Sequence, residues 1–207
     1  MKKIFLVTIL ILLFSCSLHK HKGQKSNNDS NLSETEKAII NDFLDGELKK
    51  ERYLSYKDFE IVIIEEALKK IKPLSVYEFN LKYKTSWGMS INHWILNSLQ
   101  VKKLKKVVEN EKVYHWKTID FKNMKVNTLK YEELNKMINS GMLFYDANRL
   151  VIYLSRPLVI DDDNAFLSYE IDNCKYLCNN ITHFTVLLKK ENHNWIEKEY
   201  YEDGVYY

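Results

Sequence analysis

Glycine and proline are scarce in this chain, with five and two copies among 207 residues. Loops that cradle a phosphate group need several glycines at fixed spacings, and no such pattern occurs here. The motifs H-E-x-x-H and G-x-S-x-G, typical of zinc peptidases and α/β-hydrolases, are also missing. The sequence therefore predicts no cofactor, and it contains no motif that identifies a catalytic site.

A large excess of charge of one sign is also lacking. The chain has 31 Lys and Arg residues against 28 Asp and Glu residues, for a formal net charge of +3. Lysines and acids are interspersed along the chain, which is typical of a solvated surface. Nucleic-acid binding needs a concentrated positive charge, so nucleic acid is not an expected partner.

The longest apolar run stands at the N-terminus. Lys2 and Lys3 precede residues 4–14, which are apolar except for Thr8. A helix that crosses a bilayer needs about 20 apolar residues, so this run is too short to span. A buried amphipathic helix would show a polar face, which this run lacks. The order of a basic and then an apolar region predicts a secretory signal.

The end of this run resembles a known family signature. Leu13, Phe14, Ser15 and Cys16 resemble the lipobox of bacterial lipoproteins, although Phe14 is bulkier than the residue usual at its position. The resemblance implies that Cys16 is acylated and becomes the mature N-terminus. It also implies a lipid-anchored protein of a bacterial cell envelope, facing the periplasm or the outer surface. An ordinary cleaved signal and an uncleaved anchor are the alternatives.

Cleavage before Cys16 has simple consequences for the rest of the chain. Removing residues 1–15 from 207 leaves 192, enough for one domain with a core, and takes two lysines, so the net charge becomes +1. Residues 16–32 are polar and lack apolar periodicity, which predicts a lipidated N-terminus followed by a disordered tether. Residues 33–207 are expected to form a single domain.

Two cysteines remain besides Cys16. Cys174 and Cys178 are four positions apart, and export would expose them to an oxidising compartment. That spacing allows a disulfide in a loop or helix but not along one straight strand, where the Cα atoms would be about 13 Å apart. A small loop disulfide and two free thiols both remain possible at this point. A metal site is not expected because His183 is the only nearby further ligand.

Several segments carry helical signals. Ser33 and Glu36 form a capping box before Ile40, Phe43 and Leu44, which predicts a helix over about 34–52. Further helices are expected at 65–71, ended by Pro73; at 99–110, with Leu99 facing inward; and at 130–139, ended by Gly141.

Strand signals dominate the last third of the chain. Strands are expected at 148–160, 165–171, 182–190 and 194–201, separated by polar turns. Alternating apolar residues also predict strands at 59–64 and 76–84, and a short strand at 112–121. The fold class is therefore α+β, with N-terminal helices followed by a C-terminal antiparallel meander sheet.

This last third also resembles a group of proteins. Residues 154–170, the two cysteines and residues 184–201 are similar to the C-terminal half of small envelope lipoproteins common in Bacteroidetes. The shared pattern is Ser155, Arg156 and Pro157 before an apolar pair, a turn, a Lys-rich strand, and a turn followed by Trp195. The resemblance implies a compartment and no activity.

Aromatic residues are abundant, with 14 tyrosines and four tryptophans. Such side chains are common in recognition surfaces, and the alternative is that they fill a β-rich core. The sequence favours a non-catalytic binding module for an envelope protein or a cell-wall component, through a surface built from Trp87, Trp94, Trp116, Tyr200 and Tyr201. A periplasmic immunity or inhibitor protein with a protruding acidic or aromatic loop is the second hypothesis. An enzyme whose site is invisible in the sequence is the third.

Overall fold

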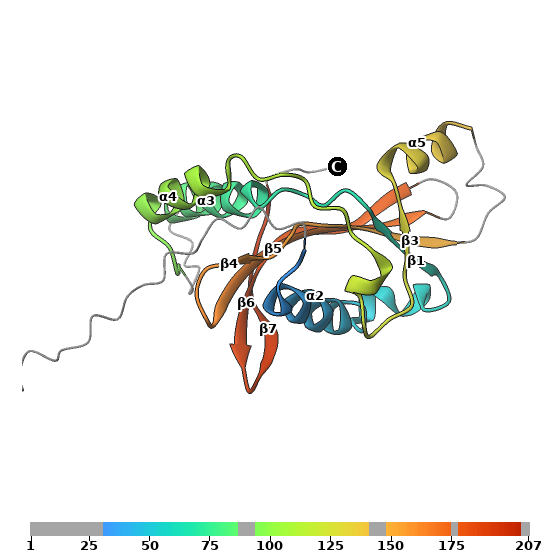
Figure 1. The fold of residues 1–207 in the computed structure, drawn as a ribbon, viewed down its shortest axis with the longest axis horizontal. Coiled ribbons are helices and arrows are strands. Elements are labelled where there is room, and N and C mark those ends of the chain that lie inside the picture. The colour runs from blue at the N-terminus through green and yellow to red at the C-terminus, as the bar shows by residue number, and fades with distance from the viewer. Residues whose placement is uncertain (1–30, 87–93, 141–147, 175–177, 204–207) are drawn as a thin grey trace, which may run out of the picture. The chain divides into compact units, whose positions relative to one another are not determined.

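The computed structural model describes residues 31–86, 94–140, 148–174 and 178–203; of residues 84–86 it describes the backbone alone (Figure 1). The chain from Asn31 onward forms one compact unit. The expected leader, Cys16, Trp87 and Gly141 lie outside the described residues. The body begins slightly earlier than residue 33, because Leu32 is already buried in the core.

Seven strands form one sheet, in the order β2-β1-β3-β5-β6-β7, with β4 pairing with β5. The strands are β1 (Glu60–Ile64), β2 (Asn127–Leu129), β3 (Arg149–Leu154), β4 (Leu158–Val159), β5 (Asn164–Cys174), β6 (Cys178–Glu191) and β7 (Asn194–Tyr201). The run β5-β6-β7 is antiparallel, and so is the pairing of β3 with β5. This confirms a C-terminal antiparallel arrangement.

The sheet is nevertheless not a pure meander. Strand β1 pairs parallel with β3 on one side and with β2 on the other. Strand β1 precedes helices α3 and α4, and β2 lies between α4 and α5, so helices and strands alternate in this part of the chain rather than segregating. The expectation of helices first and a sheet afterwards was wrong in this respect, because β1 is an apolar strand that needs a buried position beside β3.

Helices cover both faces of the sheet. Helix α2 (Glu34–Glu47) lies on one face, and α3 (Ile71–Ser86), α4 (Ser98–Val108) and α5 (Tyr131–Asn139) lie on the other (Figure 1). Side chains of β5 alternate accordingly: Leu167 and Tyr169 join the α2 core, whereas Phe166 joins the α3–α4 core. Short 3₁₀ turns occupy Glu51–Tyr56 and Thr118–Asp120.

Helix α2 begins where its sequence signals predict, but it ends at Glu47 and not at about residue 52. Ser33 is the N-cap of α2, and the Ser33 Oγ accepts a hydrogen bond from the Glu36 N–H at 3.2 Å. The Glu36 carboxylate accepts one from the Ser33 N–H at 2.9 Å, which completes the capping box. Helices α4 and α5 also lie where the sequence predicts them. Leu99 was wrongly expected inside: it is 62% exposed, and Val101 is buried instead.

The largest error concerns residues 76–84, which form most of α3 and not a strand. Leu74, Tyr77 and Asn80 are buried at a spacing of three, whereas Phe79 is exposed. Pro73 stands in the first turn of this helix, where its missing N–H costs no hydrogen bond, so it does not end a helix over 65–71. Residues 65–68 are extended instead and carry isolated bridges at Glu66 and Leu68.

Residues 112–121 also differ from the expected strand. A single bridge joins Glu66 and His115, and the 3₁₀ turn at 118–120 follows directly. This short segment adds one bridge to the extended chain at 65–68 and then turns away. Its alternating pattern therefore reflects the burial of Tyr114 and Trp116 and not a continuous ladder.

Candidate functional site

The aromatic residues expected to form a recognition surface are largely internal. Trp116 is 1% exposed, and Tyr201 is fully buried. Trp94 and Tyr200 are half-buried, and Trp87 lies outside the described residues. The expected surface was therefore wrong for Trp116 and Tyr201, and the alternative of a β-rich core accounts for these two.

The contacts of these side chains explain why they are buried. Trp116 packs between Tyr114 and Phe121, with ring centroids 5.0 and 5.8 Å away. The Trp116 Nε1–H donates a hydrogen bond to the Leu154 carbonyl at 3.3 Å, so its polar atom is satisfied in the core. Tyr201 packs edge-on against Tyr77 at 5.1 Å, beneath α3.

Two buried carboxylates hold the body together. Glu36 accepts hydrogen bonds from Arg156 and Lys70, and burial by itself would raise its pKa. The bonds from Arg156, the charge of Lys70 and the Ser33 N–H outweigh burial and lower the pKa of Glu36 to about 2. Glu36 is 4% exposed, so the pair that it forms with Arg156 is buried.

The second carboxylate, Glu47, is fully buried beneath the sheet. The Tyr53 hydroxyl donates to its Oε1 at 2.8 Å, Arg52 lies 3.1 Å from the same atom, and Lys50 donates to its Oε2. Lys50 also donates to Glu197 Oε2 at 2.7 Å. Burial is the main cause of the raised pKa of Tyr53, which keeps this phenol a donor. The network joins α2 to β7 and has a structural role.

A histidine–carboxylate pair lies on the opposite face of the sheet. His183 Nδ1 is 2.9 Å from Asp203 Oδ1, with side chains 21% and 15% exposed. Nearby on β5, burial raises the pKa of Asp172 to about 6, against a hydrogen bond from Asn180 that lowers it. Neither His183 nor Asp203 lines the groove beside Phe79 and Tyr83 or the small hollow beside Glu60 and Arg149. Neither of these two hollows therefore offers the pair a place for a substrate.

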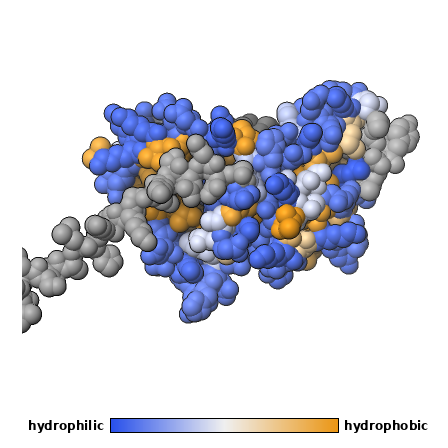
Figure 2. Space-filling view, in the orientation of Figure 1, coloured by the Kyte–Doolittle hydropathy of each residue, from blue (hydrophilic) through white to orange (hydrophobic). Residues whose placement is uncertain are grey.

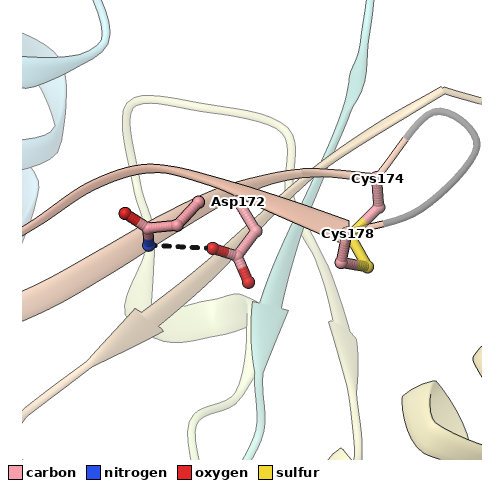
Figure 3. The surroundings of a disulfide bond; sticks show 4 residues. Asp172, Cys174 and Cys178 are labelled. Atoms are coloured by element: carbon pink, nitrogen blue, oxygen red, sulfur yellow. Dashed lines mark hydrogen bonds between the residues drawn. A yellow bond between two sulfur atoms is a disulfide. The ribbon is translucent and has the colours of Figure 1, made fainter. Parts of the chain in front are cut away.

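Cys174 and Cys178 form a disulfide at the end of the β5–β6 hairpin (Figure 3). The two residues face each other across the antiparallel strands β5 and β6, with Cα atoms 4.1 Å apart, so the bond does not run along one straight strand. Cys174 is fully buried against Val62, Ile64 and Val151. The bond therefore closes the end of the hairpin beneath α5 and stands in the core.

An exposed aromatic pair lies on α3. Phe79 and Tyr83 are 44% and 43% exposed, and their ring centroids are 4.6 Å apart. The Lys82 ammonium lies 5.1 Å from the centre of the Tyr83 ring, within the range of a cation–π contact. Two aromatic rings at positions i and i+4 thus form a small apolar patch with a cation beside it.

Helix α4 extends this patch. An open groove of about 780 Å³ runs between the two helices, and Phe79, Tyr83, Ser98 and Lys105 are among the residues that line it. Lys105 pairs with Glu78 across the groove. We use the name α3–α4 surface for this groove, its aromatic pair and the exposed outer face of α4, which comprises Leu99, Lys102, Lys103, Lys106 and Val107. Figure 2 shows apolar residues among hydrophilic ones over this end of the molecule.

The sequence contains signals for this surface that were not recognised as such. Residues 98–108 contain four lysines and no acid, which is unusual in a chain whose charges are balanced overall. At 100° per residue, Leu99, Lys103 and Val107 fall on one arc with Lys102 and Lys106. Pro73 is typical of the first turn of a helix, and a long segment without glycine follows it. Together they were a signal that residues 76–84 belong to a helix.

No helix among the described residues is long and apolar enough to cross a membrane. Over the same described ranges, no group of three or more His, Cys, Asp or Glu side chains is placed to hold a metal ion. Comparison of the chain with family models, curated proteins and solved structures finds no significant match.

Proposed function

We propose that this chain is a lipid-anchored protein of a bacterial cell envelope, that it acts as a non-catalytic binding module, and that the α3–α4 surface is its binding face. The anchor is Cys16, at the end of an N-terminal segment that resembles a lipoprotein signal. Residues 17–30 serve as a tether between the anchor and the compact unit that begins at Asn31.

One observation carries the assignment of the binding face. Phe79 and Tyr83 expose two rings in tilted contact beside a groove, on a helix whose other aromatic residue, Tyr77, is fully buried. Large rings lose little conformational entropy on binding, so a paired aromatic patch is a favourable contact region. Phe79 and Tyr83 replace Trp116 and Tyr201 in the binding face that the sequence suggested.

The anchor is tested by cell fractionation. In a bacterial host that processes lipoproteins, the full chain is expected in the membrane fraction, and Cys16→Ala is expected in the soluble or precursor fraction. Mass spectrometry of the wild-type N-terminus should find an acylated cysteine. An unchanged membrane fraction for the variant, with no acyl mass on the wild type, would refute the anchor.

The binding face is tested by site-specific photocrosslinking in the same cells. A photoreactive residue at position 79 is expected to give a discrete adduct with lipid, protein or wall material. The same residue at position 125, which is also exposed, serves as the control. Adducts of equal yield at both positions, or none at position 79, would overturn the assignment of the α3–α4 surface.

A further inference from the structure

The outer face of α4 has a composition that differs from an ordinary solvated helix. Its three outward lysines, Lys102, Lys103 and Lys106, are exposed, and residues 98–108 contain no acid. A surface helix normally mixes both signs of charge on its outer face. The outer face of α4 is therefore a local concentration of positive charge on a nearly neutral protein.

Two apolar side chains stand among these lysines. Leu99 is 62% exposed and Val107 is 78% exposed, one near each end of the helix. Their positions are not needed by the core, since Val101 and Val108 on the opposite side of α4 already fill it. Exposed apolar residues on a lysine-rich helical face are the pattern of a helix that lies along a lipid–water interface.

The charge selects the kind of partner. A lysine near an anionic lipid surface strengthens binding by roughly fivefold, so three lysines on one face form a substantial contact with such a surface. Leu99 and Val107 can enter the region between headgroups and acyl chains, where their exposed area leaves water. An acidic protein would be attracted by the lysines too, but it would leave the two apolar side chains without a matched partner of their own.

We propose that the outer face of α4 docks on an anionic phospholipid surface, with Lys102, Lys103 and Lys106 on the headgroups and Leu99 and Val107 inserted between them. This inference rests on the proposed function, because it names a partner for the α3–α4 surface. A lipid anchor holds the domain at high effective concentration beside the membrane, so a weak face is sufficient to orient it. The aromatic pair of α3 then lies beside the lipid surface.

The test uses residues 17–207, which retain the whole compact unit and lack the leader and Cys16. Cosedimentation is measured with vesicles of phosphatidylcholine alone and with equal parts phosphatidylcholine and phosphatidylglycerol. The protein is expected to bind the mixed vesicles at least about tenfold more tightly, and added salt is expected to weaken this binding. No preference for the mixed vesicles would overturn the proposal.

Two matched pairs of variants separate this face from general effects. The triple variant K102Q/K103Q/K106Q is expected to bind the mixed vesicles at least about tenfold less tightly. The triple variant K57Q/K125Q/K189Q removes the same charge at exposed positions elsewhere and is expected to change binding less than about twofold. Equal losses in the two variants would show an effect of net charge alone and overturn the proposal.

The apolar pair is tested in the same way. L99S/V107S is expected to weaken binding severalfold, whereas L54S/I119S, at positions 61% and 79% exposed, is expected to leave it unchanged. All these positions are on the surface, so thermal unfolding should remain close to wild type. Failure of vesicle binding together with a protein or wall adduct at position 79 would reject the lipid partner and retain the binding module. Loss of both results would reject the two proposals together.

Discussion

Arg156 donates two hydrogen bonds to Glu36, which lies 120 positions earlier in the sequence: Nε to Oε1 at 2.7 Å and Nη2 to Oε2 at 3.0 Å. The same guanidinium donates to the Asn31 carbonyl at 3.2 Å, where the compact unit begins. Glu36 also closes the capping box of α2. One carboxylate therefore joins α2, the segment after β3 and the start of the compact unit.

Replacing Glu36 with Gln is expected to lower the free energy of unfolding at pH 7 by about 3 kcal/mol, because Arg156 and Lys70 lose their buried partner. The lowered pKa of Glu36, about 2, means that its contribution is fully present above about pH 4.5 and is lost as the pH falls towards 2. Urea unfolding from pH 7 down to pH 3 measures both effects. Glu34→Gln, an exposed neighbour, is the control and should change little.

Replacing Ser33 with Ala is expected to cost about 1 kcal/mol, because the Glu36 N–H loses its side-chain acceptor at the start of α2. Ser98→Ala is the matched control: Ser98 begins α4, but Asn97 provides that cap. Urea unfolding of both variants gives the comparison. Equal small changes would mean that the capping box of α2 adds nothing to stability.

Asp172 has the opposite relation to pH. Its raised pKa, about 6, means that the folded protein retains a proton that the unfolded chain releases, so stability falls as the pH rises from about 4 to about 6. Asp172→Asn is expected to be more stable than wild type by about 1–3 kcal/mol at pH 7 and nearly equal at pH 4. Its amide oxygen can still accept the bond from Asn180. The exposed Asp162→Asn variant should show no such difference between pH 4 and pH 7.

The disulfide is expected to stabilise the body through its short loop. The double variant Cys174→Ala/Cys178→Ala should lower the free energy of unfolding by about 2 kcal/mol. Without the bond that closes this short loop, the unfolded chain has more conformational entropy. Residues 17–207, denatured without reductant, should show no free thiol. Two reactive thiols under those conditions would contradict the bond between Cys174 and Cys178.

Core and surface aromatic residues should respond differently to truncation. Trp116→Ala is expected to cost about 3–5 kcal/mol because it leaves a cavity beside Tyr114 and Phe121. Phe79→Ala should cost far less, since that ring is 44% exposed and leaves no comparable cavity. A small loss at Trp116, measured by thermal and urea unfolding, would contradict its placement in the core.

The parts of this protein that the sequence determined by itself depend on near neighbours. The capping box at Ser33 and Glu36 is satisfied within four residues, so the start of α2 could be read directly. The pairing of β6 with β7 was readable because the two strands are joined by a short polar turn at Asn192 and His193. Helices α4 and α5 likewise begin and end close to their predicted limits.

Tertiary structure decided everything that depends on distant partners. Residues 76–84 alternate between apolar and polar side chains like a strand, yet they pair with no strand of the sheet. They form part of helix α3 instead, and from this helix Tyr77 packs against Phe166 and Tyr201 of the sheet. Trp116 and Tyr201 have no local signal that separates a core ring from a surface ring, because burial is set by what folds over them. The parallel pairing of β1 with β3 and the ion pair between Glu36 and Arg156 join residues about 90 to 120 positions apart. No short window of sequence contains both partners of either contact.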